Sequence, residues 1–556
     1  MAEPESTRVD FQVDPANYRH WEVATDDSVA NLQMVVDPSG GLRNYYELKM
    51  NSYDLAVDIE LYDIVQRLRF EHPSIKAVVL TGGIDKIFCA GANIQMLATS
   101  THQHKVNFCK FTNETRNSIE DASANSGQTW LAAINGTAAG GGYELALACD
   151  EILLIDDRSS AVSLPEIPLL AVLPGTGGLT RLVDKRHVRR DLADAFATRT
   201  EGVRGKQALS WGLVDAIAPG RDFDALVSQR AAHHVAQSDR PNSASPIVFE
   251  PLNRTFEADS VEYGNVSVTL DRHLGTAEIT VRAPTTSQPL TAIEFETLGS
   301  KSWLIETARE LDDAFLHLRF NETDIGTWII RTRGDAASVL AAERVLAPDN
   351  DSWLARESRL YWARTLTRLD LSARSIIALV DPGSCFSGML AELLLAADRS
   401  YMLDGTWEGS DALAPEIVLS DANLGWFKMS NGLSRLESRF WGRDAALAKV
   451  GDLAGTPLKS AEALDGELIT FAMDDIDWDD EIRVMLEERN SFSPDALTGM
   501  EANFRFVGPE TMETKIFARL SAWQNWIFQR PNAVGPTGAL KRFGTGSRPD
   551  YDHTRV

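Results

Sequence analysis

Trp130-Leu-Ala-Ala-Ile134 begins the stretch that decides the fold, and Asn135-Gly136, the glycines Gly140 to Gly142 and Tyr143-Glu144 follow it. An apolar run, a glycine-rich turn and a helical pattern in this order predict a buried strand that passes into a helix. Such a turn exposes the first backbone N–H groups of the helix, where an anion binds. Because Glu144 would repel a phosphate, the turn better fits an oxyanion site beside an acid/base group.

Two further segments accompany this stretch. Upstream, Ile75–Gly83 is a buried-strand pattern that ends in glycines, and Phe88-Cys-Ala-Gly-Ala92 comes soon after it. Downstream, Leu164-Pro-Glu166 precedes Pro174-Gly-Thr-Gly-Gly178. Glycine-rich turns also serve close packing, so one of them alone is a weak signal. The ordered set of three segments is what favours a functional site.

In order and spacing, the three segments resemble the signatures of the crotonase (enoyl-CoA hydratase/isomerase) family. The resemblance implies an acyl-CoA thioester substrate. It implies that the backbone N–H groups of Ala92 and Gly141 form the oxyanion hole for the thioester oxygen. It also implies that Glu144 and Glu166 are the catalytic acid/base pair. Asn93 departs from the family pattern, because many members carry Asp there.

The same resemblance suggests further site residues. It places Lys49, Lys86 and Ala90 beside the CoA moiety, with the two lysines as phosphate contacts, although exposed lysines are equally often only solvated. Cys109 lies on the helix that follows the oxyanion segment, where family members line the acyl pocket. We include it as a candidate catalytic residue, and the alternative is a buried thiol that only fills space.

The second half of the chain repeats the first in weak but ordered matches. Arg374–Val380 followed by Leu390–Asp398 is similar to Trp130–Asp150. Gly432-Leu-Ser-Arg-Leu436 is similar to Gly178-Leu-Thr-Arg-Leu182. These matches predict an internal duplication.

The second copy lacks the chemical groups of the first. No Phe-x-Ala-Gly-Ala element follows Arg331, and Met389 stands at or near the oxyanion glycine position. Glu392 aligns with Glu144, but a glutamate at a helix start is favoured by the helix dipole without any catalytic role. We therefore expect one active copy and one degenerate copy.

The fold class that follows is α/β, a crotonase-like spiral of ββα units that is duplicated and extended by C-terminal helices. The expected domains are an N-terminal arm (1–20), a catalytic crotonase-like domain (21–236), a linker (237–260), a degenerate crotonase-like domain (261–475), and a C-terminal helical region with a tail (476–556).

Charge and composition exclude several function classes. The net charge is −26, from 80 acidic and 54 basic residues, which disfavours nucleic-acid and anionic-membrane binding. The N-terminus lacks the pattern of a signal peptide, and the sparse cysteines (Cys89, Cys109, Cys149 and Cys385) do not form a disulfide framework. We expect a soluble cytoplasmic protein. His102 and His104 are not completed by further ligands, so no metal site is assigned.

The preferred interpretation is an acyl-CoA enzyme in which water adds beside the thioester, without any cofactor beyond the CoA of its substrate. The two-copy chain favours a specialised member over a plain hydratase. The alternatives are an ordinary enoyl-CoA hydratase or isomerase for a straight acyl chain, and a non-catalytic scaffold or RNA-binding relative. We expect a homodimer, because the second copy is available to cover the sheet flank that family members bury in trimers.

Overall fold

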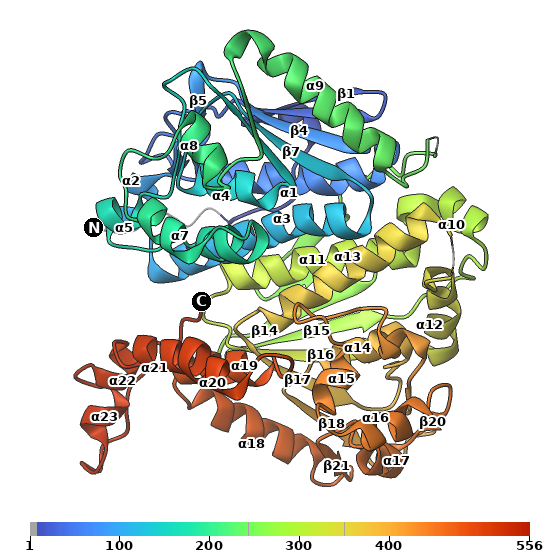
Figure 1. Ribbon diagram of the computed structural model, residues 1–556. Helices are drawn as coiled ribbons and strands as arrows, with labels where there is room; N and C mark the ends of the chain where they lie inside the picture. Colours follow the sequence, from blue (N-terminus) through green and yellow to red (C-terminus); the bar gives the residue numbers. More distant parts are fainter. Residues whose placement is uncertain (1–7, 243, 350) are drawn as a thin grey trace. The chain divides into compact units, whose positions relative to one another are not determined.

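The computed structural model describes residues 8–242, 244–349 and 351–556. They divide into two compact units (Figure 1). One unit is Asp10–Pro251, and the other is Leu252–Val556 together with residues 8 and 9.

The unit Asp10–Pro251 is built on a six-stranded sheet in the order β1-β2-β4-β7-β9-β11. The first two strands form an antiparallel hairpin, and every later neighbour is parallel. The apolar runs within Ile75–Gly83 and Trp130–Ile134 form the central strands β4 and β7, which are buried because parallel strands are covered on both faces. The bounds are β1 (Trp21–Asp26), β2 (Val29–Met34), β4 (Ala77–Gly82), β7 (Thr129–Ile134), β9 (Glu151–Ile155) and β11 (Ala216–Ala218).

Helices cover both faces of this sheet (Figure 1). Helix α9 (Gly220–Gln237) lies on one face, where Phe223 and Ala231 pack against Val79 and Leu131. Helices α1 (Leu55–Phe70) and α3 (His102–Asn125) lie on the other. The shorter helices are α2 (Ile94–Thr99), α4 (Gly141–Ala148), α5 (Glu166–Leu170), α6 (Gly178–Thr180), α7 (Arg190–Ala197) and α8 (Gly205–Ser210).

A second, smaller layer carries the glycine-rich turns. Strands β5 (Lys86–Cys89), β8 (Gly136–Ala139) and β10 (Val162–Ser163) form a parallel sheet in the order β10-β8-β5. Strand β6 (Gly91–Ala92) pairs with β3 (Ser52–Tyr53). The three signature segments therefore lie close together, because each one contains or follows one of these neighbouring strands.

The other unit has an eight-stranded sheet in the order β12-β13-β14-β15-β16-β17-β18-β21. Its antiparallel hairpin β14-β15 is followed by parallel neighbours, as the hairpin β1-β2 is in the first unit. This shared topology agrees with the predicted duplication. The bounds are β12 (Thr255–Phe256), β13 (Ser260–Glu262), β14 (Val266–Asp271), β15 (Thr276–Arg282), β16 (Thr327–Arg333), β17 (Ser375–Val380), β18 (Arg399–Leu403) and β21 (Phe471–Met473).

Helix α18 (Trp478–Asn490) packs on one face of that sheet through Trp478 and Met485. Helices α11 (Trp303–Asn321) and α13 (Trp353–Asp370) lie on the opposite face (Figure 1). The remaining elements are α10 (Ala292–Leu298), α12 (Ala336–Glu343), α14 (Ala391–Leu395), α15 (Arg435–Arg439), β19 (Ile417–Val418), α16 (Asp444–Gly451), β20 (Pro457–Leu458), α17 (Ser460–Asp465), α19 (Pro494–Phe504), α20 (Met512–Thr514), α21 (Ser521–Ile527), α22 (Pro531–Val534) and α23 (Ala539–Arg542).

Two segments with the composition of a linker and of a tail are more ordered than their sequences suggest. Within residues 237–260, Arg240 is buried and donates to the carbonyl of Pro73, and residues 255–256 form β12. At the end of the chain, Arg555 is buried and pairs with Glu501 at 2.6 Å. A few buried side chains anchor each segment, and composition averaged over many residues does not reveal them.

Candidate active site

Two glycine-rich turns bring the proposed oxyanion donors together. Gly91 has φ +89°, and a Cβ there would lie 2.7 Å from the carbonyl oxygen of Ala139 and 3.0 Å from the nitrogen of Gly141. A Cβ on Gly141 would lie 3.3 Å from the nitrogen of Ala92. The close approach of two backbone segments therefore requires glycine. Ala92 and Gly141 therefore lie side by side, and two neighbouring backbone N–H groups are what an oxyanion hole requires.

Glu144 lies on the first turn of α4 and is buried, with 2% of its surface exposed. Its carboxylate accepts hydrogen bonds from the backbone N–H of Thr176 at 3.0 Å and of Gly178 at 2.8 Å. The hydroxyl of Thr176 donates to the other oxygen. The segment Pro174–Gly178 therefore holds Glu144 in one orientation.

Glu166 begins the short helix α5 and is half-buried beside the glycine turn. The N–H of Gly140 donates to the carbonyl of Ser163 at 2.9 Å, which ties the Glu166 segment to the turn. Gly140 has φ +51°, and a Cβ there would lie 2.5 Å from Oε1 of Glu166. Burial, and then the negative charge of Glu144, raises the pKa of Glu166 to about 7. Its Oε2 is buried without a hydrogen-bond partner.

Cys109 faces the segment that holds Glu144. A Cβ on Gly175 would lie 3.4 Å from its Sγ, and Asn113 donates to the carbonyls of both Cys109 and Gly175. Burial, and then the charge of Glu144, raises the pKa of the Cys109 thiol to about 11. The group is therefore a neutral thiol at physiological pH, which does not suit a nucleophile.

The proposed CoA contacts lie on the loops around these turns. Lys49 is exposed and pairs with Glu47 at 2.8 Å. Lys86 is exposed at the start of β5, and the N–H of Ala90 donates to the carbonyl of Met50 at 3.1 Å. Asn93 caps α2 by accepting from the N–H of Met96. A neutral amide serves as this cap, since Asn and Asp are equally good N-cap residues.

Two residues of the candidate site were not predicted from the sequence. Thr176 lies inside the glycine-rich signature, yet no local pattern indicates that its hydroxyl reaches Glu144. Arg116 is buried on α3 and donates to the carbonyl of Gly141 at 2.8 Å. A single arginine on a polar helix gives no periodic signal, so only the tertiary contact identifies it.

The corresponding turn of the second unit is filled by the chain itself. The N–H of Met389 donates to Glu343 at 2.6 Å, so a carboxylate of the same chain takes the place of an oxyanion. Glu392 is buried and is held by Asn423 at 2.8 Å and by Arg435 at 3.1 Å. These contacts give Glu392 a structural role and leave its carboxylate occupied.

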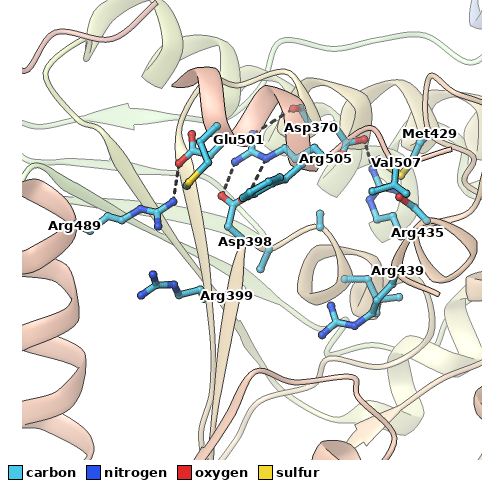
Figure 2. Close-up of a pocket in the computed structure, with 16 residues that line it drawn as sticks. Asp370, Asp398, Arg399, Met429, Arg435, Arg439, Arg489, Glu501, Arg505 and Val507 are labelled. Carbon is cyan, nitrogen blue, oxygen red and sulfur yellow. Dashed lines mark hydrogen bonds and ion pairs between the residues drawn. The ribbon is translucent and has the colours of Figure 1, made fainter. Parts of the chain in front are cut away.

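A pocket of about 440 Å³ in the second unit lies where β18 begins (Figure 2). Six of its charged side chains form three ion pairs: Arg435 with Asp370 at 2.6 Å, Arg489 with Glu501 at 2.8 Å, and Arg505 with Asp398 at 2.6 Å. The pocket is thus bordered by internal ion pairs that join α15 to α13, α18 to α19, and the end of α19 to the start of β18.

Among residues 8–242, 244–349 and 351–556, no group of three or more His, Cys, Asp or Glu side chains is arranged to hold a metal ion. No helix in the same ranges has the length and apolarity needed to cross a membrane.

The chain belongs to the crotonase (enoyl-CoA hydratase/isomerase) family, whose profile matches residues 47–278. It is 54% identical to the benzoyl-CoA-dihydrodiol lyase of Aromatoleum evansii over 554 residues, which is 100% of this chain and 99% of that protein. An identity of 54% over the whole chain is sufficient to assign the protein to this family.

Solved structures also match part of the chain. An enoyl-CoA hydratase of Bacillus anthracis is 27% identical, with a TM-score of 0.34, and the match covers 39% of this chain and 77% of that one. DspI of Pseudomonas aeruginosa is 26% identical, with a TM-score of 0.34, over 42% of this chain and 85% of that one.

Proposed function

We propose that this protein opens the ring of 2,3-epoxybenzoyl-CoA with two waters, giving 3,4-didehydroadipyl-CoA semialdehyde and formate in aerobic, CoA-dependent benzoate breakdown. The observation that carries the proposal is the 54% identity, over the whole chain, to a protein named benzoyl-CoA-dihydrodiol lyase. The pairing of Ala92 and Gly141, with Glu144 and Glu166 beside them, supports it.

The first half of the proposed reaction adds water. The ring carbon that bears the thioester is the α carbon, and C2 is the β carbon. When the epoxide rearranges to the seven-membered oxepin, C2 becomes an electrophilic carbon conjugated to the thioester. Glu144 takes a proton from water, which adds at C2. The hemiacetal that forms then opens to two aldehydes, one of which is a formyl group on the α carbon, while Glu144 gives its proton back to a carbon of the resulting enolate and is again a base.

The second half cleaves a carbon–carbon bond. Another water attacks the formyl carbon, and the bond to the α carbon breaks. The electron pair moves into the thioester enolate, whose oxygen lies at the N–H groups of Ala92 and Gly141. Glu166 returns a proton to the α carbon, and formate leaves. Each oxyanion donor contributes on the order of 3 kcal/mol of barrier lowering.

The two carboxylates take different roles because their surroundings differ. Glu166, with a pKa of about 7, holds a proton at neutral pH and serves as the acid. Glu144 receives three hydrogen-bond donors and serves as the base. In this scheme Cys109 borders the acyl pocket, and Lys49, Lys86 and Ala90 border the CoA moiety.

The second candidate function is hydration or isomerisation of a straight-chain enoyl-CoA. It is favoured by the family profile, which is that of enoyl-CoA hydratases and isomerases. The same oxyanion pair and the same glutamates would serve that reaction, so the two candidates differ in the acyl group.

Formate release separates the candidates. Chelator-treated protein is mixed with 2,3-epoxybenzoyl-CoA in ¹⁸O-labelled water, and the products are analysed by mass spectrometry. We expect one labelled formate for each substrate consumed, and none with Glu166→Gln. Rapid hydration of crotonyl-CoA without any formate from the epoxide would favour the second candidate.

We also propose that the protein forms a homodimer. Analytical sedimentation of the full chain tests this oligomeric state. A trimer or a hexamer would contradict it.

A further inference from the structure

Behind the oxyanion turn lies a buried guanidinium that the reaction scheme leaves unused. Arg116 on α3 is 1% exposed, and its Nη2 donates to the carbonyl oxygen of Gly141 at 2.8 Å. Its Nε and Nη1 are buried and have no hydrogen-bond partner. Its Cζ lies 5.8 Å from the centre of the Tyr53 ring. The charge is therefore held one hydrogen bond away from the residue that carries an oxyanion donor.

The nearby carboxylate does not neutralise this charge by direct contact. Asp58 is fully buried, and it accepts from the hydroxyl of Tyr53 and from that of Thr115 at 3.2 Å. Among the residues that the structure describes, no ion pair joins Arg116 to Asp58 or to Glu144. Burial raises the pKa of Asp58 to about 7, so part of its negative charge is lost at neutral pH.

The duplication supplies an internal comparison. Leu68-Arg69-Phe70 precedes β4 at the same spacing as Leu318-Arg319-Phe320 precedes β16. When Arg69 of α1 is aligned with Arg319 of α11, Trp303 corresponds to Tyr53, and Ala308 corresponds to Asp58.

The other helix pair aligns in the same way. Gly127 and Ala373 both have positive φ, +67° and +55°, two residues before the strands that follow α3 and α13. When Gly127 is aligned with Ala373, Trp362 of α13 corresponds to Arg116 of α3. The rings of Trp303 and Trp362 lie 6.4 Å apart, so these two positions are neighbours in both copies.

These two buried charges therefore occur in the copy that has the oxyanion turn, and Trp362 and Ala308 replace them in the copy whose turn is filled by Glu343. Stability does not explain the difference, because a buried charge without an ion-pair partner destabilises a fold relative to apolar packing. A charge held behind the oxyanion turn gains its partner when negative charge develops there during the reaction.

We propose that Arg116 is a positioning residue for the reaction: through the carbonyl of Gly141 it fixes the first turn of α4, and its charge favours the enolate at Ala92 and Gly141. The inference rests on the proposed function only in assuming that a thioester oxygen binds at these two N–H groups.

The test compares Arg116→Met with Arg69→Met in the full chain. Arg69 is also fully buried, pairs with Asp121 at 2.7 Å, and has an arginine counterpart in the second copy, so its role is structural. We expect Arg116→Met to lower kcat roughly 10²-fold, as loss of an oxyanion donor does, with KM within threefold and Tm unchanged or raised. Arg69→Met should lower Tm and leave kcat of the folded protein intact.

A second readout does not depend on turnover. Benzoyl-CoA with a ¹³C-labelled thioester carbonyl is bound to each protein, and its carbonyl stretch is measured by infrared difference spectroscopy. We expect the stretch to move to higher wavenumber in Arg116→Met, and to move part of the way back in Arg116→Lys, which also serves if the Met variant does not fold.

The proposal is overturned if the Arg116 variants keep the wild-type carbonyl frequency, or if Arg116→Met loses kcat only in parallel with Tm. A wild-type protein that binds benzoyl-CoA with a lowered stretch but releases no formate from the epoxide would reject the proposed function alone. The role of Arg116 would then be measured with whichever CoA thioester the protein converts.

Discussion

At the scale of single residues, Glu144 and Glu166 differ in the surroundings of their carboxyl groups. Glu144 is enclosed by donors from Thr176 and Gly178, whereas Glu166 has a buried oxygen without a donor. The raised pKa of Glu166 follows from burial and from its negative neighbour.

The rate should therefore depend on the protonation of Glu166. Its raised pKa of about 7 means that the proton is held below that pH and lost above it. If the group must donate a proton, kcat falls as the pH rises through about 7. In Glu144→Gln, removal of the negative charge should lower the pKa of Glu166, which the carboxyl band in an infrared titration reports. A band that titrates at the same pH in both proteins would contradict the coupling.

The thiol of Cys109 should act as a neutral group. Because its pKa is raised to about 11, we expect Cys109→Ser to keep at least a third of the wild-type kcat, since a hydroxyl preserves a neutral donor of similar size. Cys109→Ala should lose more, on the order of tenfold, if the group donates to the substrate. The values of kcat from steady-state kinetics of both variants show whether the Cys109 thiol acts as a neutral donor. A serine variant as inactive as Glu144→Gln would identify a nucleophilic thiol.

At the scale of elements, the site depends on how the smaller sheet meets α4. Gly140 precedes the helix with φ +51° and ψ −125°, and no side chain caps the turn. This conformation suits glycine and leaves the first N–H groups of the helix directed outward. The same residue leaves space for the carboxyl of Glu166.

Gly140→Ala should therefore disable the site. The added Cβ meets Glu166 Oε1 at 2.5 Å, so the acid must move, and the strained backbone costs about 1–3 kcal/mol of stability. We expect kcat to fall at least 10²-fold, which kinetics and urea unfolding measure together. Gly409→Ala is the matched control, because Gly409 also has positive φ (+74°) but its Cβ would contact nothing within 4 Å. Equal losses of kcat in both variants would show that the contact with Glu166 is unimportant.

At the scale of the whole molecule, the chain holds two copies of one topology with different interiors. In the first unit, backbone N–H groups and a carboxylate are arranged around a glycine turn. In the second, Glu343 fills the turn, and Glu392 pairs with Arg435. The second copy thus keeps the fold while its polar groups bond to one another.

Glu392→Gln should separate stability from catalysis. Loss of the carboxylate removes one of two buried partners of Arg435, whose other partner Asp370 remains, so the expected cost is about 1–3 kcal/mol. We expect a lower free energy of unfolding in urea, with kcat and KM of the folded protein unchanged. Glu144→Gln should instead lower kcat and leave the free energy of unfolding in urea unchanged. Loss of turnover in Glu392→Gln without loss of stability would indicate a second active site.

Local sequence patterns determined the class of fold and the segments of the candidate site. The apolar runs before Gly83 and Gly136 marked the strands, and the glycines marked the turns, because burial and turn geometry restrict residues within a few positions of one another. The weak repeat of these patterns predicted the duplication. Periodicity carries this information because it reflects contacts that recur along one element.

The tertiary structure alone decided which distant groups meet. The hydroxyl of Thr176 reaches Glu144, the guanidinium of Arg116 reaches the carbonyl of Gly141, and Glu343 fills the turn at Met389. Each contact joins residues at least 25 positions apart, and none is part of a periodic pattern. The raised pKa of Glu166 also depends on burial and on the neighbouring charge of Glu144, which arise only when the chain is packed.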